Sequence, residues 1–188
     1  MVVDMCEVGG ASVLAGAVSG RRGFARLVEL VPTPPCPSLI YLDFRQVEVA
    51  TASYLRESVL AYRAFVRGQR STAYPIIANA NVEVRDEFHE LVQARGDALP
   101  VCDLNEEAER TSCEIIGELD PKQRLTYDLV TERGETDAGE LWRSHSAAEG
   151  LASPTAWNNR LSSLASLGLL IEHSQGRAKR YRSVFKEY

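Results

Sequence analysis

Near the C-terminus of this 188-residue chain, short polar side chains occur at a spacing that suits contact with nucleic-acid bases. On a helix drawn at 100° per residue, the apolar residues of segment 153–170 share one face and the polar ones lie opposite or beside it. An asparagine in such a position can bridge the donor and acceptor on an adenine edge. The predicted base-edge contacts are Thr155, Asn158, Asn159 and Ser162.

Basic side chains follow at a spacing suited to phosphate. Four of them fall within positions 177–182, where a strand is expected after a tight turn. A fifth, Arg160, lies about 60° from the centre of the apolar helix face, at its rim. Arginine and lysine side chains that neutralise phosphates make binding salt-dependent. The predicted phosphate contacts are Arg160, Arg177, Lys179, Arg180 and Arg182.

Charge is distributed unevenly along the chain. The net charge is −5, and residues 1–118 hold 11 basic and 17 acidic residues, whereas residues 150–188 hold six basic and two acidic ones. A basic segment on an acidic protein favours local contact with phosphate over general attraction to nucleic acid.

Three helices and a hairpin are expected to position these residues. Asp120 is a strong N-cap, because Pro121 follows it and Gln123 completes a capping box. The expected elements are helices over 120–133, 136–150 and 153–168, followed by a β-hairpin that ends at 184.

The order of these elements resembles a bacterial winged helix-turn-helix domain. Ser153 to Leu170 resembles the recognition helix of that family, and His173 to Arg182 resembles its wing. The resemblance implies that the helix enters the major groove of double-stranded DNA while the wing follows the backbone. It also implies a homodimer that reads two half-sites.

The first hundred residues alternate between short apolar runs and amphipathic segments. Strands are expected over 39–44, 73–78 and 99–104, and helices over 51–68 and 82–95. Alternation of this kind predicts right-handed crossovers and a small, mainly parallel α/β sheet.

The run from Tyr41 to Leu55 resembles the strand-turn-helix of STAS-like domains of the anti-sigma-factor-antagonist type. That family has an apolar strand that ends in an acid, here Asp43, and a serine at the start of the next helix, here Ser53. The resemblance implies a protein partner of the ATPase or kinase type, which phosphorylates the serine in signalling members. From the residue alone, Ser53 is either the helix N-cap or a phosphosite.

The same helix carries a row of arginines on one side, typical of a solvated face. These are Arg56, Arg63, Arg67 and Arg70. The domain organisation that follows is a STAS-like domain over 1–104, a helical connector over 105–118 and a winged helix-turn-helix domain over 119–188.

Several classes of function are not expected. The four cysteines are scattered without a C-x-x-C pair, and only three histidines are present, so neither a metal site nor a disulfide framework is predicted. No cofactor fingerprint or convergent catalytic group is visible, so the chain is not expected to be an enzyme. No segment has the length and apolarity of a membrane span, and a cytoplasmic protein is expected.

The sequence thus predicts a DNA-binding regulatory protein in which the STAS-like domain receives a signal or binds a partner. The alternative is a non-catalytic adaptor subunit of a larger assembly, such as a genome-defence or anti-sigma-type complex. In that case both domains serve protein contacts, since fold alone does not fix function.

Overall fold

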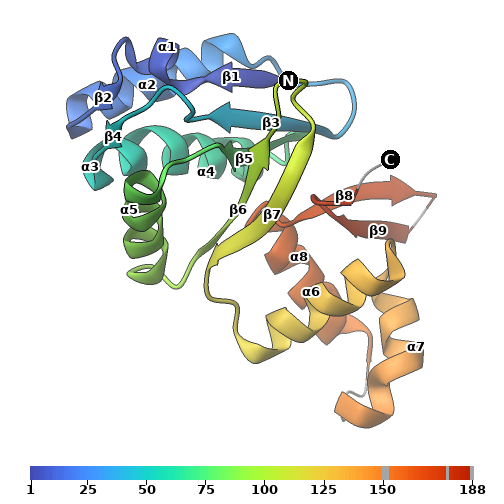
Figure 1. The fold of residues 1–188 in the computed structure, drawn as a ribbon. Helices are drawn as coiled ribbons and strands as arrows, with labels where there is room; N and C mark the ends of the chain where they lie inside the picture. Colours follow the sequence, from blue (N-terminus) through green and yellow to red (C-terminus); the bar gives the residue numbers. More distant parts are fainter. Residues whose placement is uncertain (150–152, 177, 187–188) are drawn as a thin grey trace. The chain divides into compact units, whose positions relative to one another are not determined.

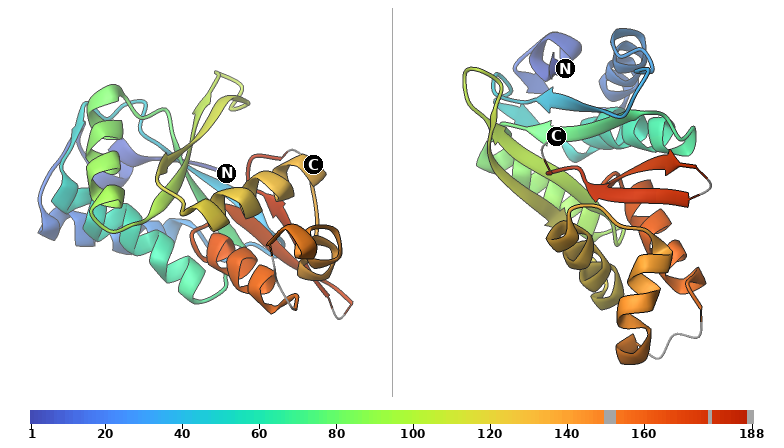
Figure 2. Two further views of the ribbon diagram at one scale, coloured as in Figure 1. Left: turned by 90° about the horizontal axis from the view of Figure 1, so that it is seen from below. Right: turned by 90° about the vertical axis from the view of Figure 1, so that its right-hand side faces the viewer.

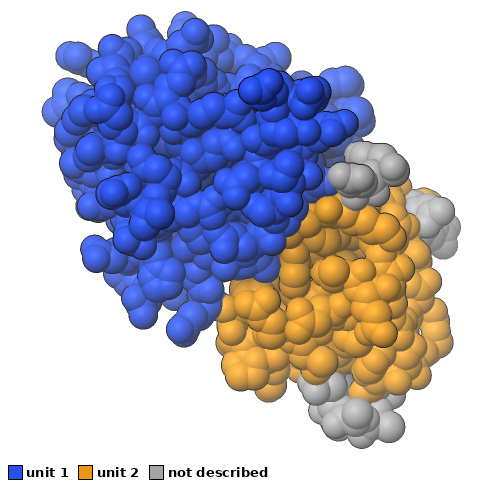
Figure 3. All heavy atoms as spheres, viewed as in Figure 1, with its two compact units in different colours: residues 1–118 blue, residues 119–188 orange. Residues whose placement is uncertain are grey.

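The structure is a computed structural model that describes residues 1–149, 153–176 and 178–186 (Figure 1). The chain divides into two compact units, residues 1–118 (unit 1) and 119–188 (unit 2), coloured separately in Figure 3.

Unit 1 is built on a five-stranded, mainly parallel sheet in a mixed α/β arrangement. Its strands are β1 (Val2–Asp4), β3 (Ser38–Asp43), β5 (Ala73–Ala78), β6 (Ala98–Leu104) and β7 (Arg110–Gly117). They lie in the order β1-β3-β5-β6-β7, with the first four parallel and β7 antiparallel to β6. A separate pair of short parallel strands joins β2 (Val13–Leu14) to β4 (Val49–Ala50). The α/β class expected from the alternating pattern is confirmed.

The helices of unit 1 lie on one side of this sheet (Figures 1 and 2). They are α1 (Met5–Gly9), α2 (Ala17–Leu30), α3 (Ala52–Leu55), the π-helical turn η1 (Arg56–Leu60), α4 (Ala61–Gly68) and α5 (Val82–Gln93). Because the parallel strands follow each other in sequence order, right-handed crossovers place every connecting helix on the same face. The core is formed there by strand residues such as Ile40, Leu42 and Val101 together with Leu55 and Phe88 from the helices.

The prediction of a helical connector over 105–118 is wrong. Residues 110–117 form β7, which pairs with β6 so that Ile116 lies opposite Leu99 and Cys113 opposite Cys102. The acidic run expected to open a helix lies instead in the turn before β7. Ile116 is buried, and the β-branched residues of this segment favour a strand once β6 offers an edge. The sheet domain therefore extends beyond residue 104.

The arginines of the long helix do not form a solvated row. Arg63 is only 8% exposed, and its guanidinium pairs with Asp97 and donates a 2.8 Å hydrogen bond to the carbonyl oxygen of Ala98. Arg67 donates to the carbonyl oxygens of Ser71 and Ala73. Both side chains therefore fasten α4 to the N-terminal ends of neighbouring strands.

The described residues of unit 2 form three helices followed by an antiparallel hairpin. The elements are α6 (Pro121–Arg133), α7 (Ala138–Glu149), α8 (Thr155–Ser166), β8 (Leu170–Gln175) and β9 (Ala178–Ser183). Asp120 caps α6 through the expected capping box with Gln123. The segment before α7 joins the hairpin, because Thr136 exchanges both backbone hydrogen bonds with Tyr181 of β9.

The core of unit 2 is centred on the apolar face of α8. Trp157, Leu161 and Leu164 are fully buried, as the helical spacing predicts, and they share the interior with Val130 of α6 and Tyr181 of β9. Burial of this face leaves the opposite face of α8 for solvent or a partner.

Candidate nucleic-acid interface

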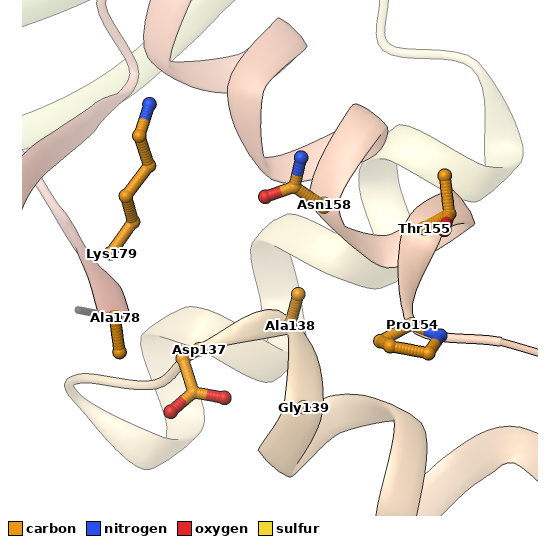
Figure 4. A pocket seen from close by; sticks show the side chains of 8 residues that line it. All are labelled: Asp137, Ala138, Gly139, Pro154, Thr155, Asn158, Ala178 and Lys179. Carbon is orange, nitrogen blue, oxygen red and sulfur yellow. The ribbon is translucent and has the colours of Figure 1, made fainter.

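A concavity of about 500 Å³ lies where the starts of α7, α8 and β9 converge in unit 2 (Figure 4). It is lined by Asp137, Ala138, Gly139, Pro154, Thr155, Asn158, Ala178 and Lys179. Figure 4 shows the Asn158 side chain pointing from α8 toward the strand that carries Lys179. The hydroxyl of Thr155 and the amide of Asn158, both on α8, thus share one site with the ammonium group of Lys179 on β9.

Of the four predicted base-edge residues, three are exposed and one is half-buried. Thr155, Asn158 and Asn159 are exposed, and the first two line the concavity. Ser162 is half-buried, with its Oγ 3.4 Å from the hydroxyl of Tyr181. The sequence of α8 contains no aspartate or glutamate, so its exposed face is polar without negative charge.

Most of the predicted phosphate residues are buried or contact other groups of the chain. The Nζ of Lys179 lies 2.8 Å from a carboxylate oxygen of Glu172, although 43% of the lysine side chain is exposed. Arg182 is buried, at 8% exposure. Arg160 lies with its guanidinium carbon 4.8 Å from the centroid of the Trp157 ring, and Arg177 lies outside the described residues.

Arg180, a predicted phosphate contact, is bound to three carboxylates of unit 2 in this structure. Its guanidinium bonds Glu135 at 3.0 Å, Glu140 at 2.7 Å and Asp137 at 3.3 Å. The bridge between Thr136 and Tyr181 brings this acidic segment alongside β9. The number of basic residues in the hairpin therefore overstates the positive charge available to phosphate, because the acids that neutralise Arg180 lie 40 to 45 residues earlier in the sequence.

The hydrogen bond from Arg180 is the main reason why the pKa of Glu140 lies below its ordinary value, with a further contribution from the Thr136 hydroxyl. Partial desolvation of the carboxyl acts in the opposite direction. A carboxyl group with a lowered pKa in the folded state stabilises that state as long as it is ionised.

Stability of unit 2 should therefore depend on pH through Glu140. The stabilising contribution is complete above the ordinary value of 4.5 and is lost as the pH falls through the lower folded-state pKa. In urea unfolding at pH 7, Glu140→Gln should have a lower free energy of unfolding than the wild type. This difference in free energy should become smaller at pH 3. Glu132→Gln, at an exposed site on α6, is the control. If the difference in free energy of unfolding between Glu140→Gln and the wild type is the same at pH 3 and pH 7, the pH-dependent contribution assigned to Glu140 is wrong.

In unit 1, Ser53 is not the helix cap. Thr51 occupies that position, and its side chain accepts from the backbone N–H of Tyr54 at 3.4 Å. The half-buried Ser53 lies in the first turn, with its Oγ 3.1 Å from the Thr51 hydroxyl. A sequence pattern fixes the start of a helix only to within one or two residues. Here the N-cap lies two residues before Ser53, at Thr51.

Asp43 ends β3 as expected, and its carboxylate has partners within unit 1. The carboxylate oxygen Oδ1 accepts from the backbone N–H of Arg45 at 2.9 Å and from the side-chain amide of Asn79 at 2.8 Å. Asn79 adopts a left-handed backbone with φ +52° and accepts from the N–H of Leu104 at 2.7 Å. Asp43 therefore orders the carboxyl ends of three neighbouring strands.

Sequence reasoning missed a group of exposed valines near the start of α3. Val13 and Val49 are register partners in the short sheet and are 52% and 46% exposed. Val82 is 69% exposed, and the preceding Asn81 donates to the carbonyl oxygens of Val47 and Glu48. No periodicity marks these positions, because each belongs to a different short element. We call Val13, Val49 and Val82 the valine patch.

Within the described part of the chain, no group of three or more histidine, cysteine or acidic residues could hold a metal ion. No described helix combines the length and apolarity needed to cross a membrane. No family model matches the sequence, and no curated protein or solved structure is significantly similar to it. Its function must therefore be inferred from its own residues and geometry.

Proposed function

We propose that unit 2 is a winged helix-turn-helix domain that binds duplex DNA, with α8 as its recognition helix. The observation that carries the proposal is the exposed face of α8, which offers Thr155, Asn158 and Asn159 without any acidic residue on the helix. Surface helices usually carry charged residues of both signs on their outer face, whereas a groove-reading helix needs short donors and acceptors and no negative charge.

The proposal gives each exposed polar or basic residue beside α8 a role. Thr155, Asn158 and Asn159 contact base edges, while Lys179 and Arg160 contact phosphates. Arg180 acts indirectly, because its three carboxylate partners hold β9 against the start of α7. A homodimer would present two copies of α8 to two half-sites.

This distribution of charge predicts a moderate salt dependence. Each phosphate neutralised by a cation changes the slope of log K against log salt by about −0.9. With Lys179, Arg160 and one further basic residue in contact, each protomer should give a slope of roughly −3. A protein that used all five predicted cations would give a slope of about −4.5.

Asn158→Asp combined with Asn159→Asp should weaken binding of the full chain to a labelled duplex at least about tenfold. The change replaces two amide donors by carboxylates near base edges and phosphates, and a good base contact alone is worth about 1–3 kcal/mol. Fluorescence anisotropy at two salt concentrations measures the effect.

The matched control is Arg124→Gln combined with Thr131→Asp on the exposed surface of α6, which also lowers the net charge by two. This control variant should retain most of the affinity. The DNA proposal fails if the wild type does not bind duplex at low salt, or if both variants weaken binding equally.

We further propose that unit 1 is a STAS-like module that binds a protein partner in the cytoplasm, and the valine patch supports this second role. Exposed apolar side chains that cluster on a surface commonly mark an interaction site. The patch adjoins the start of α3, because Thr51 accepts from the N–H of Gly16 and donates its own N–H to Leu14. Ser53, in that same first turn, is where a phosphate would alter the surface that a partner contacts.

Affinity purification from the host should recover an ATPase or kinase with the wild type and lose it with Val49→Asp. Leu30→Asp is the control, since Leu30 is 52% exposed at the end of α2, away from the valine patch in sequence. Equal recovery with both variants would contradict docking on the valine patch. Mass spectrometry of the recovered chain reports whether Ser53 carries phosphate.

A further inference from the structure

Two cysteines of unit 1, Cys102 on β6 and Cys113 on β7, lie opposite each other in the sheet. The antiparallel register between these strands runs without interruption over residues 98–103 of β6, and it pairs Cys102 directly with Cys113. Residues that lie opposite each other in an antiparallel pair project to the same face of the sheet. Both cysteines are free thiols in this structure.

The backbone hydrogen bonds around Cys102 show which kind of pair this is. The carbonyl oxygen of Cys102 accepts from the N–H of Asn79, at 3.0 Å, and so points toward β5. The N–H of the next residue, Asp103, points toward β7, where it donates to the Ser112 hydroxyl at 3.2 Å. Cys102 and Cys113 are therefore a non-hydrogen-bonded pair, in which the Cα atoms lie about 4.5 Å apart and the side chains approach most closely. Because a disulfide needs a Cα separation of about 4.4–6.8 Å, this pair can be bridged without backbone movement.

The two thiols have different environments, and this difference fixes the order in which they react. Cys113 is exposed, whereas Cys102 is fully buried. Burial is the main reason why the pKa of the Cys102 thiol is raised to about 12; the neighbouring Cys113 raises it further, against a smaller opposing influence of Arg110. Since the thiolate is the nucleophile in thiol–disulfide exchange, Cys113 is the thiol that reacts first with a reagent from solvent.

We propose that Cys102 and Cys113 are a redox-responsive modification site, at which a small-molecule disulfide of the glutathione type introduces a reversible disulfide between β6 and β7. The Cys113 thiolate attacks one sulfur of the small disulfide and releases the other half as a thiolate, which leaves a mixed disulfide on Cys113. Cys102 then loses its proton and attacks the Cys113 sulfur, and the second small thiol leaves. Two protein thiols are thus oxidised to one disulfide, while the small disulfide is reduced to two thiols.

An excess of small thiol reverses both steps, and disulfides in reducing compartments are usually transient bonds of this kind. The inference goes beyond the proposed function and does not depend on whether unit 2 binds DNA.

Oxidised glutathione is the probe, added to the reduced full chain before acid quenching, alkylation of the remaining thiols and peptide mass mapping. Trypsin cleaves after Arg110, between the two cysteines, so the bridge appears as peptide 96–110 linked to peptide 111–122. In the wild type this linked pair should contain most of the Cys113. Dithiothreitol should convert it back into two separate peptides.

Three variants separate the possible outcomes. Cys113→Ser, at an exposed site, should leave Cys102 as an unmodified thiol, whereas Cys102→Ala should retain glutathione on Cys113 because the second thiol is missing. Cys36→Ser is the matched control, since Cys36 is also exposed but lies between α2 and β3, and it should give as much linked peptide as the wild type. The proposal is overturned if Cys113 of the wild type does not react, or if it keeps glutathione while Cys102 stays reduced. It is also overturned if Cys113 is linked to Cys6 or Cys36 instead.

Discussion

Replacing Trp157 by alanine should lower the free energy of unfolding of unit 2 by about 3–5 kcal/mol, as for other large-to-small changes at buried aromatic residues. Trp157 is fully buried, its ring meets that of His145 edge-on at 6.1 Å, and the Arg160 guanidinium lies over it. Its indole N–H has no hydrogen-bond partner among the described residues, so packing accounts for most of the loss.

Such a loss approaches the whole stability of a domain as small as unit 2. Urea unfolding followed by the fluorescence of Trp142 measures it, since that residue lies on α7 in the same unit. The cooperative transition of unit 2 should move to much lower urea or disappear, while unit 1 keeps its own transition. A loss below about 1 kcal/mol would contradict the central place of Trp157 in the core.

Replacing Arg63 by methionine should destabilise unit 1 by about 3 kcal/mol, within the range for breaking a buried ion pair from one side. The side chains of Arg63 and Asp97 are 10% and 15% exposed, so solvent screens the pair little. The substitution leaves a buried carboxylate and the carbonyl oxygen of Ala98 without the guanidinium. Adding Asp97→Asn should recover part of the loss, because the isolated charge is removed.

Arg56→Met is the matched control for Arg63. It lies on the same continuous helix, is 45% exposed and pairs only with its neighbour Glu57 among the interactions described above. Its replacement should change the free energy of unfolding by no more than about 0.5 kcal/mol. If Arg63→Met and Arg56→Met have the same free energy of unfolding, then this face of the helix is solvated and Arg63 does not form a stabilising buried ion pair with Asp97.

Local patterns predicted those elements whose causes are local. The capping box at Asp120 and Gln123 depends on residues three positions apart, and the helical spacing placed Trp157 in the core without reference to other segments. Alternation of apolar runs and amphipathic segments was enough for the mainly parallel sheet, because the handedness of crossovers leaves few alternatives.

Features that depend on distant segments were not predictable. Residues 110–117 became a strand because β6 offered an edge, which outweighed a weak helical pattern. Arg180 carries a plausible phosphate-binding charge in sequence, yet its partners come from the segment that Thr136 anchors to Tyr181. Charge counted along a chain cannot show which pairs the fold will make.

The central proposal is that duplex DNA contacts the start of α8, and hydrogen exchange tests it most directly. The first backbone N–H groups of a helix lack intrahelical partners, so in the free protein the amides of Thr155 and its neighbours should exchange rapidly. Adding a random-sequence duplex at low salt to the full chain should slow exchange across residues 155–159 and near Lys179, and leave residues 1–118 unchanged. The proposal is contradicted if the duplex binds but exchange at the start of α8 does not change. It is also contradicted if the duplex slows exchange only within residues 1–118.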